Sequence, residues 1–438
     1  MFLLARRWLG PRDAMFAAAL YTANPYHLVI VYWRSAFAEL LASCLLPVLL
    51  LMILKARENA RLAVISLALV LAAAWLTNAP AAVMIHYSFA LLLSFFSWRD
   101  RSPRLLLLGA VSITLGAGLA ALYLFPAIYE QRWVNIADAV SPGSRPQDNF
   151  LFMHTADPDH DRFNHLVSWV ALAEIFITFL ALFVGKLWRD EKGTIWNALA
   201  AWAITCSALM FSVSGVLWNL LPKLRFMQFP WRWMLCLSLV FSILVAVGVR
   251  RWWGRAVVYL AILVVIVFVW RSVQPPWWDN PADLREMQDN METSAGYEGT
   301  DEYTPTGADP SSVDKDARKV KVEGSGHAAI HVLAWGEESK IFTAKMSSPG
   351  ELALRLFNYP AWRVEVNGNV VRPGSLEGTG QMLVPVEACP NRVQITLIRT
   401  WDRTAGAWIS AAAWFCLLLW TVLNLKRPAP NQSEAPIS

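Results

Sequence analysis

The sequence predicts a polytopic α-helical membrane protein that also carries a small extracytoplasmic β-sandwich. Of its 438 residues, 56% are hydrophobic and only 16% are charged, whereas soluble domains carry about a quarter charged residues. Apolar runs recur along the chain, and many reach the roughly 20 residues that a helix needs to cross a bilayer. A stretch near the C-terminus instead alternates apolar and polar residues, as strands do.

The apolar runs predict about ten transmembrane helices. Short charged connections separate them. The expected spans cover 13–33, 36–54, 60–77, 79–97, 105–125, 166–185, 194–213, 231–249, 255–273 and 404–424.

Lys and Arg near the span ends predict the orientation, because cytoplasmic loops retain them. Seventeen of these residues fall at the chain ends and on one set of connections, against seven on the other set. The seven are Arg34, Arg132, Arg145, Arg162, Lys223, Arg225 and Arg232. Both termini are therefore expected on the cytoplasmic side of an inner membrane. Anionic lipid head groups account for the net charge of +5, so no nucleic acid partner is expected.

The domain boundaries follow from the same map. Residues 1–274 form the multi-span domain, with outer loops at 126–165 and 214–230, and 404–424 form the last span. Residues 275–403 are expected to be β-rich and extracytoplasmic, because strand patterns flank Asn367-Gly368, a strong hairpin signal. Residues 425–438 are expected to be a disordered cytoplasmic tail.

The first outer loop contains HTADPDHDRFNH, which concentrates acids and imidazoles. A divalent metal ion suits such a mixture, and a solvated polar loop is the alternative. The metal candidates are His154, His160 and His165, and the acids, which are also candidate catalytic bases, are Asp157, Asp159 and Asp161.

The second outer loop, within VSGVLWNLLPKLRFMQFPWRWM, is too polar to span. Its apolar residues predict a face that lies on the membrane surface. Arg225, Gln228 and Arg232 would then project near the boundary, where guanidinium groups can bind phosphate in bidentate fashion. Ordinary snorkelling of Arg at a span end is the alternative.

The stretch NPYHLVIVYWRSAFAE, residues 24–39, places polar groups between two apolar runs. Glu39 and Glu174 are the acids expected several residues inside a span, where ionisable groups usually face a cavity or a partner. An Arg34–Glu39 ion pair would account for both charges structurally. His27, beside Tyr26, is either a proton acceptor, a partner for a sugar hydroxyl, or a hydrogen-bonded structural residue.

Three blocks carry a resemblance to a known family. NPYHLVIVYWRSAFAELLASCLLPVLL, LTNAPAAVMIHYSFALL and PKLRFMQFPWRWM resemble bacterial integral membrane proteins called 6-pyruvoyl-tetrahydropterin synthase-related. Asn78 stands where that family often has His. The resemblance extends to GYEGTDEYTPTGAD and YPAWRVEVNG, and so covers most of the chain.

The resemblance implies an activity different from the one in the family's name. A pterin synthase is a soluble zinc enzyme, whereas this architecture is similar to the GT-C superfamily of glycosyltransferases that use polyprenyl-phosphate-linked sugars. Such enzymes typically carry a catalytic acid in the outer loop that directly follows their first span, upstream of both loops described above. This chain begins with what resembles the tail of an earlier span, so that loop is expected to be missing and no catalytic residue is assigned.

The resemblance implies that Arg225, Gln228, Arg232, Tyr26, His27, Arg34, Glu39 and Asn78 contact the substrate or its phosphate. Two other classes of protein stay open. A lipid or sugar transporter would also use intramembrane charges, but would show repeated halves with broken helices. A non-catalytic scaffold for assembly of envelope polysaccharide would tolerate loss of these polar side chains.

Overall fold

The computed structural model describes residues 1–58, 60–187, 193–249, 251–273, 301–309, 317–324 and 326–425, together with isolated positions between 281 and 312. The chain divides into two compact units. The helical unit comprises Met1–Leu124, Pro142–Val273 and Ala405–Ser438, and the β-unit comprises Phe125–Ser141 and Gln274–Thr404. The expected tail lies outside the described residues except for Leu425, and so does most of 275–300.

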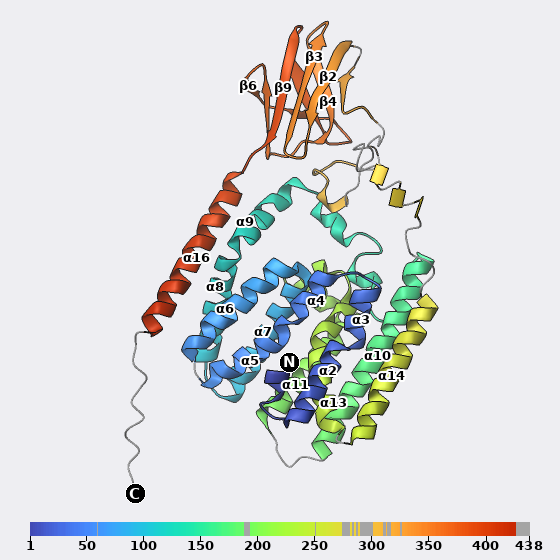
Figure 1. Cartoon of the computed structure of the whole chain (residues 1–438), viewed down its shortest axis with the longest axis vertical. Helices are drawn as coiled ribbons and strands as arrows, with labels where there is room; N and C mark the ends of the chain where they lie inside the picture. Colours follow the sequence, from blue (N-terminus) through green and yellow to red (C-terminus); the bar gives the residue numbers. More distant parts are fainter. Residues whose placement is uncertain are drawn as a thin grey trace. The chain divides into compact units, whose positions relative to one another are not determined.

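The helical unit is built from apolar α-helices packed side by side (Figure 1). Their bounds are α1 Phe2–Ala5, α2 Pro11–Thr22, α3 Pro25–Tyr32, α4 Phe37–Ser43, α5 Leu45–Glu58, α6 Ala60–Thr77, α7 Ala79–Arg99, α8 Arg104–Leu119, α9 Ala121–Glu130, α10 Pro158–Leu187, α11 Thr194–Leu209, α12 Gly215–Leu220, α13 Met234–Gly248, α14 Trp252–Val273 and α16 Trp401–Leu425. Helices α9 and α16 each have residues in both units.

Six helices in the described part of the chain are long and apolar enough to cross a membrane, or eight if two sharply bent pairs each form one span. The bent pairs are Arg104–Leu119 with Ala121–Trp133 and Thr194–Leu209 with Ser212–Leu220. Two shorter apolar helices, Ala63–Thr77 and Trp252–Val264, lie where further spans are expected. The number ten stays a prediction.

Sequence signals set several helix starts. Asn24 caps α3 by accepting a hydrogen bond from the backbone N–H of Tyr26, and Pro25 stands at the first helical position, where its missing N–H costs nothing. Asn78 caps α7 in the same way, with Ala81 as donor. Because Pro25 cannot donate to α2, the first candidate span, Pro11–Tyr32, is divided into two helices between Thr22 and Pro25.

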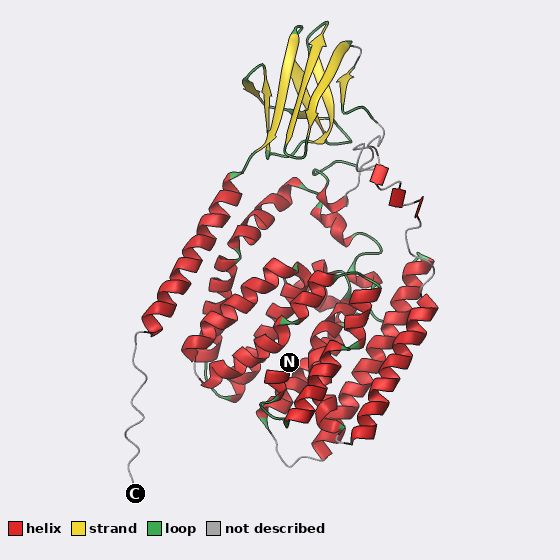
Figure 2. Ribbon diagram, in the orientation of Figure 1, coloured by secondary structure: helices red, strands yellow, loops and turns green. Residues whose placement is uncertain are grey.

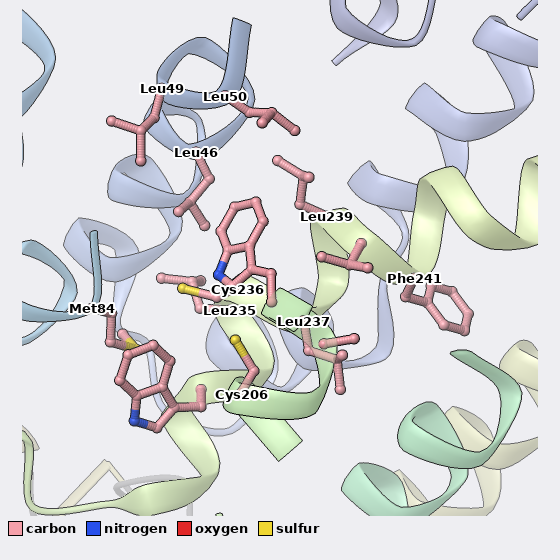
Figure 3. Packing of buried hydrophobic residues seen from close by; sticks show 14 of the residues in the cluster. Leu46, Leu49, Leu50, Met84, Cys206, Leu235, Cys236, Leu237, Leu239 and Phe241 are labelled. Atoms are coloured by element: carbon pink, nitrogen blue, oxygen red, sulfur yellow. The ribbon is translucent and has the colours of Figure 1, made fainter. Parts of the chain in front are cut away.

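Helix α13 is the centre of the helical unit. All its residues from Met234 to Val247 are buried, and it packs against α10, α2 and α11. Figure 3 shows its side chains meeting those of α5, α7 and α11, with Cys206 and Cys236 among them. Elsewhere small residues permit close approach: a Cβ on Gly116 of α8 would lie 3.0 Å from the carbonyl oxygen of Ala68 on α6.

The β-unit contains two antiparallel sheets over one apolar core (Figure 2). The strand orders are β1-β4-β8-β7 and β2-β3-β9-β5-β6. Phe342 and Ile395 from one sheet meet Leu352 and Val384 from the other. The strands are β1 Val320–Glu323, β2 Ala328–Trp335, β3 Ser339–Met346, β4 Gly350–Phe357, β5 Trp362–Val366, β6 Asn369–Val371, β7 Gly374–Ser375, β8 Gln381–Val386 and β9 Pro390–Leu397.

The expected hairpin is confirmed at Asn367-Gly368. Both residues have positive φ, 53° and 83°, as a two-residue type I′ turn requires, and Val366 pairs with Asn369 across it.

The first predicted outer loop differs from the expected 126–165 at both ends. Its beginning, Phe125–Ser141, belongs to the β-unit, where the backbone N–H of Asn135 donates to the carbonyl of Thr304 at 3.0 Å. Its end is helical, because α10 already begins at Pro158. The loop therefore contributes residues to both compact units, and its position outside the membrane stays a prediction.

Candidate functional site

A buried polar cluster forms where α3 turns back into α4. Ser35, in the turn, has a φ of +47°, and the N–H of Ala36 donates to the carbonyl of Ile30 at 3.1 Å. This reversal carries Glu39, in the first turn of α4, back alongside Tyr26 and Arg34. A local backbone feature of the 24–39 stretch thus assembles one half of the site.

Glu39 is the centre of the cluster and is only 1% exposed. One carboxylate oxygen accepts a 2.5 Å hydrogen bond from the Tyr26 hydroxyl, and the other accepts a 2.8 Å bond from Nη1 of Arg34. Nε of Arg232 lies 3.5 Å from the same oxygen as Arg34. The ion pair expected from the sequence is present, and a second arginine joins it.

Arg232 reaches Glu39 from the distant PWRW segment, the 3-10 helix η6 Pro230–Trp233. Its Nη1 donates to the carbonyl of Met227 at 2.7 Å, and its guanidinium lies over the ring of Phe229. Only 8% of the surface of this residue is exposed. Arg232 is therefore held by the fold and does not snorkel to a surface.

Aromatic rings enclose the cluster. The guanidinium of Arg34 lies 4.9 Å from the ring centroid of Trp231, where the ring quadrupole attracts a cation. Trp231 also meets the edges of Tyr26 and Phe163, and Phe163 meets Trp33. These rings lower the local dielectric constant and so strengthen each charge interaction inside.

The cluster contains more positive than negative charge. Two guanidinium groups share one carboxylate, which leaves an excess of one positive charge among the described groups in contact. Burial alone would lower the pKa of Arg34, but Tyr26 and Glu39 hold that pKa above its ordinary value. Arginine is effectively always protonated in proteins, so both guanidinium groups stay charged.

Three N–H donors around this cluster lack acceptors in the described part of the chain: Nε of Arg232 and the indole Nε1 atoms of Trp33 and Trp231. All three groups can only donate, and an unmade hydrogen bond at a buried donor costs about 1–3 kcal/mol. An anion rich in acceptor oxygens would satisfy both the donors and the charge. The residue types and their burial are compatible with the binding of an oxyanion.

A second buried carboxylate belongs to Glu174 of α10, which is 2% exposed. Its Oε1 accepts a 2.8 Å hydrogen bond from the side-chain amide of Asn24, and its Oε2 has no hydrogen-bond partner among the described residues. The sequence singled out Glu174 as an intramembrane acid but did not connect it with Asn24.

His27 makes no hydrogen bond or ion pair with Glu39 or Glu174 in the described structure. Its ring packs edge-on against Tyr21, with 4.9 Å between centroids, and hydrogen-bonds the backbone of Tyr21. Its Nε2 is buried without a hydrogen-bond partner. These contacts fit the structural alternative for His27.

The remaining predicted phosphate contacts lie in different settings. Arg225 is exposed, with its guanidinium over Phe226, so it does not share the buried setting of Arg232. Gln228 is half-buried and adopts a φ of +64° between η5 (Leu224–Met227) and η6. Asn78 serves as the cap of α7.

The second loop also differs from an apolar face lying on a membrane surface. Trp218, Leu224 and Trp231 are buried in the core of the helical unit, whereas Leu220 is exposed. Val213, Val216 and Leu217 are exposed as well. The apolar residues of this segment are therefore divided between the core and the surface, and its contact with a membrane stays a prediction.

The acid and histidine cluster of the first loop is spread over local structural roles. Asp157 accepts from the N–H of Asp159 at the start of α10, and Asp161 accepts from the N–H of Thr155 and lies 3.2 Å from Nδ1 of His154. His160 hydrogen-bonds Asn149 at 2.7 Å, and His165 accepts from Trp169.

In these contacts the Asp side chains accept backbone N–H groups at the start of α10 and in the turn before it. In the described residues, no group of three or more His, Cys, Asp or Glu side chains is arranged to hold a metal ion. The three histidines proposed as ligands are therefore not brought together as one set.

The start of α10 nevertheless lies beside the arginine cluster. His160 packs against Phe229, and Phe163 packs against Trp231. Asp159 precedes Phe163 by four residues and so lies on the same face of the helix, one turn away. Sequence reasoning treated this loop and the PWRW segment as separate sites.

Comparison with known proteins gives a family. A model described as "6-pyruvoyl-tetrahydropterin synthase related domain; membrane protein" matches residues 1–275. The chain belongs to this family of membrane proteins. The match covers α1 to α14, including both halves of the arginine cluster. No curated protein and no solved structure matches the chain.

Proposed function

We propose that this family member binds a polyprenyl-phosphate-linked sugar and transfers the sugar to an acceptor hydroxyl, as GT-C glycosyltransferases do. The observation that carries the proposal is the buried Arg34–Glu39–Arg232 cluster, with its excess positive charge and unsatisfied donors. A phosphate group would supply the missing negative charge, and its oxygens would accept hydrogen bonds from the unsatisfied N–H donors. The isoprenoid would occupy lipid or a groove between spans.

In this proposal the two arginines stabilise the leaving group. The acceptor oxygen forms a bond to the anomeric carbon on the face opposite the phosphate, and the carbon–oxygen bond to phosphate breaks with its electron pair going to phosphate. Arg34 and Arg232 would gain interaction energy as that charge develops, which is what accelerates a reaction. Arg225 and Gln228 would contact the substrate from the exposed rim of the site.

The acceptor must lose a proton, and Asp159 is the carboxylate best placed to take it. It lies one helical turn from Phe163, which packs on Trp231. Asp157 and Asp161 already accept backbone N–H groups, so their carboxylates are less available.

The proposal places the site at the outer face of the cytoplasmic membrane. Lys and Arg distribution supports both termini on the inner side, ten spans, and a β-unit outside. In that arrangement α3, η6 and the start of α10 lie near the outer boundary, where a polyprenyl phosphate presents its head group.

A binding measurement on the purified full-length protein in lipid nanodiscs tests the proposal. Native mass spectrometry would compare a polyprenyl phosphate with the polyprenol of equal chain length. We expect the phosphate to bind and the alcohol to bind at least tenfold more weakly, since about 1.4 kcal/mol corresponds to a factor of ten. Equal binding of the two lipids would overturn the assignment.

Variants assign the effect to residues. R232A and R34A should abolish both phosphate binding and sugar transfer while membrane insertion persists, and R232K, which keeps the charge but loses the fork of donors, should bind weakly. R99A, at an exposed helix end outside the cluster, is the matched control and should bind normally. Unchanged transfer in R232A would refute the role of this arginine.

The same experiment separates the other two classes of protein. Phosphate-dependent binding without transfer of a labelled sugar, but with movement of the lipid across a sealed vesicle membrane, would favour a transporter. Absence of both, together with tolerance of R34A and R232A, would favour a scaffold for assembly of envelope polysaccharide.

A further inference from the structure

The setting of Glu174 differs from that of a structural ion pair. The residue lies in the interior of the candidate span Pro158–Gly185, about 24 Å of helix from its start and about 16 Å from its end. Its only recorded side-chain partner is Asn24, a neutral amide, and its Oε2 has none among the described residues. An ionised carboxylate buried in this way costs several kcal/mol.

No positive charge compensates Glu174 in the described part of the chain. The elements that pack most extensively against α10 are α11, α13, α14 and η6, and Asn24 reaches it from the cap of α3. The cationic groups on these elements lie elsewhere: Arg232 pairs with Glu39, Arg255 pairs with Asp13, and Arg271 is exposed. The other titratable groups also contact different partners. These pairs are Tyr259 with Phe16, Cys206 with Cys236, Tyr26 with Glu39 and His27 with Tyr21.

Along α10 itself, His165 is the nearest described titratable residue, nine positions or about 13 Å away. The remaining way to hold Glu174 in the apolar interior is as a neutral acid.

We propose that Glu174, on α10, binds a proton beside Asn24, which lies at the break in the first span. We further propose that gain or loss of this proton changes the position of α3 and so affects the arginine cluster. The ligand is a proton and not a metal cation, because Glu174 Oε1 and the Asn24 side-chain oxygen already accept hydrogen bonds. Oε2 is the oxygen that would carry the hydrogen. This site goes beyond the proposed transfer activity and does not depend on it.

A continuous path joins the two carboxylates. Asn24 donates to Glu174 at 2.8 Å and accepts from the backbone N–H of Tyr26 at 2.9 Å, and the Tyr26 hydroxyl donates to Glu39 at 2.5 Å. Loss of the proton would strengthen the bond from Asn24, since an ionised acceptor binds a donor more strongly. Asn24 caps α3, so this change acts on the helix that carries Tyr26.

Labelling with a fluorescent hydrophobic carbodiimide tests the proposal in the full-length protein. This reagent adds to a protonated carboxyl group in apolar surroundings, and the adduct is located by peptide mapping. We expect Glu174 to be labelled at neutral pH, labelling to be lost as the pH rises, and E174Q to show no label at that peptide. Glu39, whose two carboxylate oxygens accept hydrogen bonds from Tyr26 and Arg34, should not be labelled at neutral pH.

A variant of Asn24, the cap residue of α3, gives a second test. N24S keeps a good helix cap but is too short to donate to Glu174, so the half-labelling pH should rise by about one unit, the equivalent of one ordinary hydrogen bond. N78S, the same change at the cap of α7, is the matched control and should leave the midpoint unchanged.

Several results would overturn the proposal. Wild-type protein that stays unlabelled at Glu174 even at acidic pH, with the peptide recovered, excludes a protonatable acid there. Protection by sodium ions at constant pH would assign a metal cation in place of the proton. An unchanged midpoint in N24S, with that variant folded, would exclude the hydrogen bond from Asn24 to Glu174 and with it the first link of the path to the arginine cluster. None of these readings involves the polyprenyl phosphate, so they are independent of the transfer activity.

Discussion

Two buried carboxylates in the helical unit show opposite ways of holding an acid in an apolar environment. Glu39 has two guanidinium groups and a hydroxyl within contact distance, so the positive charge around it exceeds its own negative charge. Glu174 has a single amide. Both are almost completely inaccessible to solvent, so burial alone does not define their chemistry. The difference lies in the charge of the partners: the first site attracts an anion, and the second favours a proton.

The largest effect is expected from removing the charge of Glu39. E39Q leaves Arg34 and Arg232 buried without a counter-charge, which destabilises a protein by about 3–5 kcal/mol. Thermal unfolding in detergent, followed by intrinsic fluorescence, would detect this loss. E58Q is the matched control, because Glu58 pairs with Arg7 at an exposed position, where ion pairs contribute about 0–1 kcal/mol. Equal effects of the two changes would contradict our description of Glu39.

Removing the tyrosine hydroxyl should have the next largest effect. Y26F deletes the 2.5 Å hydrogen bond to Glu39, and bonds to charged groups contribute roughly 1.5–3 kcal/mol. Y32F, at an exposed position on the same helix, controls for the loss of a hydroxyl from α3. The same unfolding assay applies, and a change in Y32F as large as that in Y26F would remove the special role of the buried hydroxyl.

Part of this arrangement follows from the sequence. The apolar runs predict the helices, Asn24-Pro25 and Asn78 mark helix starts, and Asn367-Gly368 marks the β5–β6 hairpin, because each signal acts over a few neighbouring residues. The Arg34–Glu39 pair is also local, since five positions separate its members.

The contacts between distant segments do not follow from the sequence. Arg232 and Glu39 are far apart in the chain, and so are Asn24 and Glu174; both pairs meet only because α13, α10 and α3 pack together. Polarity predicts the loop 126–165 but does not reveal that Phe125–Ser141 belongs to the β-unit. Likewise, apolar spacing does not distinguish a side chain that faces lipid from one that packs on protein, so the burial of Trp218 and Leu224 in the second loop does not follow from the sequence.

The pH dependence of stability should separate the two acids more finely. If the folded protein holds a proton on Glu174 that the unfolded chain has lost, the folded state binds more protons, and the free energy of unfolding falls as the pH rises. The slope is at most about 1.4 kcal/mol per pH unit. It begins above about pH 4.3, where an unfolded Glu ionises, and ends once the folded protein also releases its proton. Subtracting the profile of E174Q from that of wild type isolates this contribution.

The smallest effect is expected from E174Q at a pH where Glu174 holds its proton. Glutamine then replaces one neutral group with another of nearly equal size, and it keeps an oxygen that can accept from Asn24. The free energy of unfolding should change by less than about 1 kcal/mol, against several for E39Q. E174L would delete the acceptor for Asn24 and cost about 1–3 kcal/mol, which shows that the assay can detect a change at this position. A loss in E174Q as large as that in E39Q would mean that Glu174 is ionised and has a cationic partner, and the contrast between the two carboxylates would no longer hold.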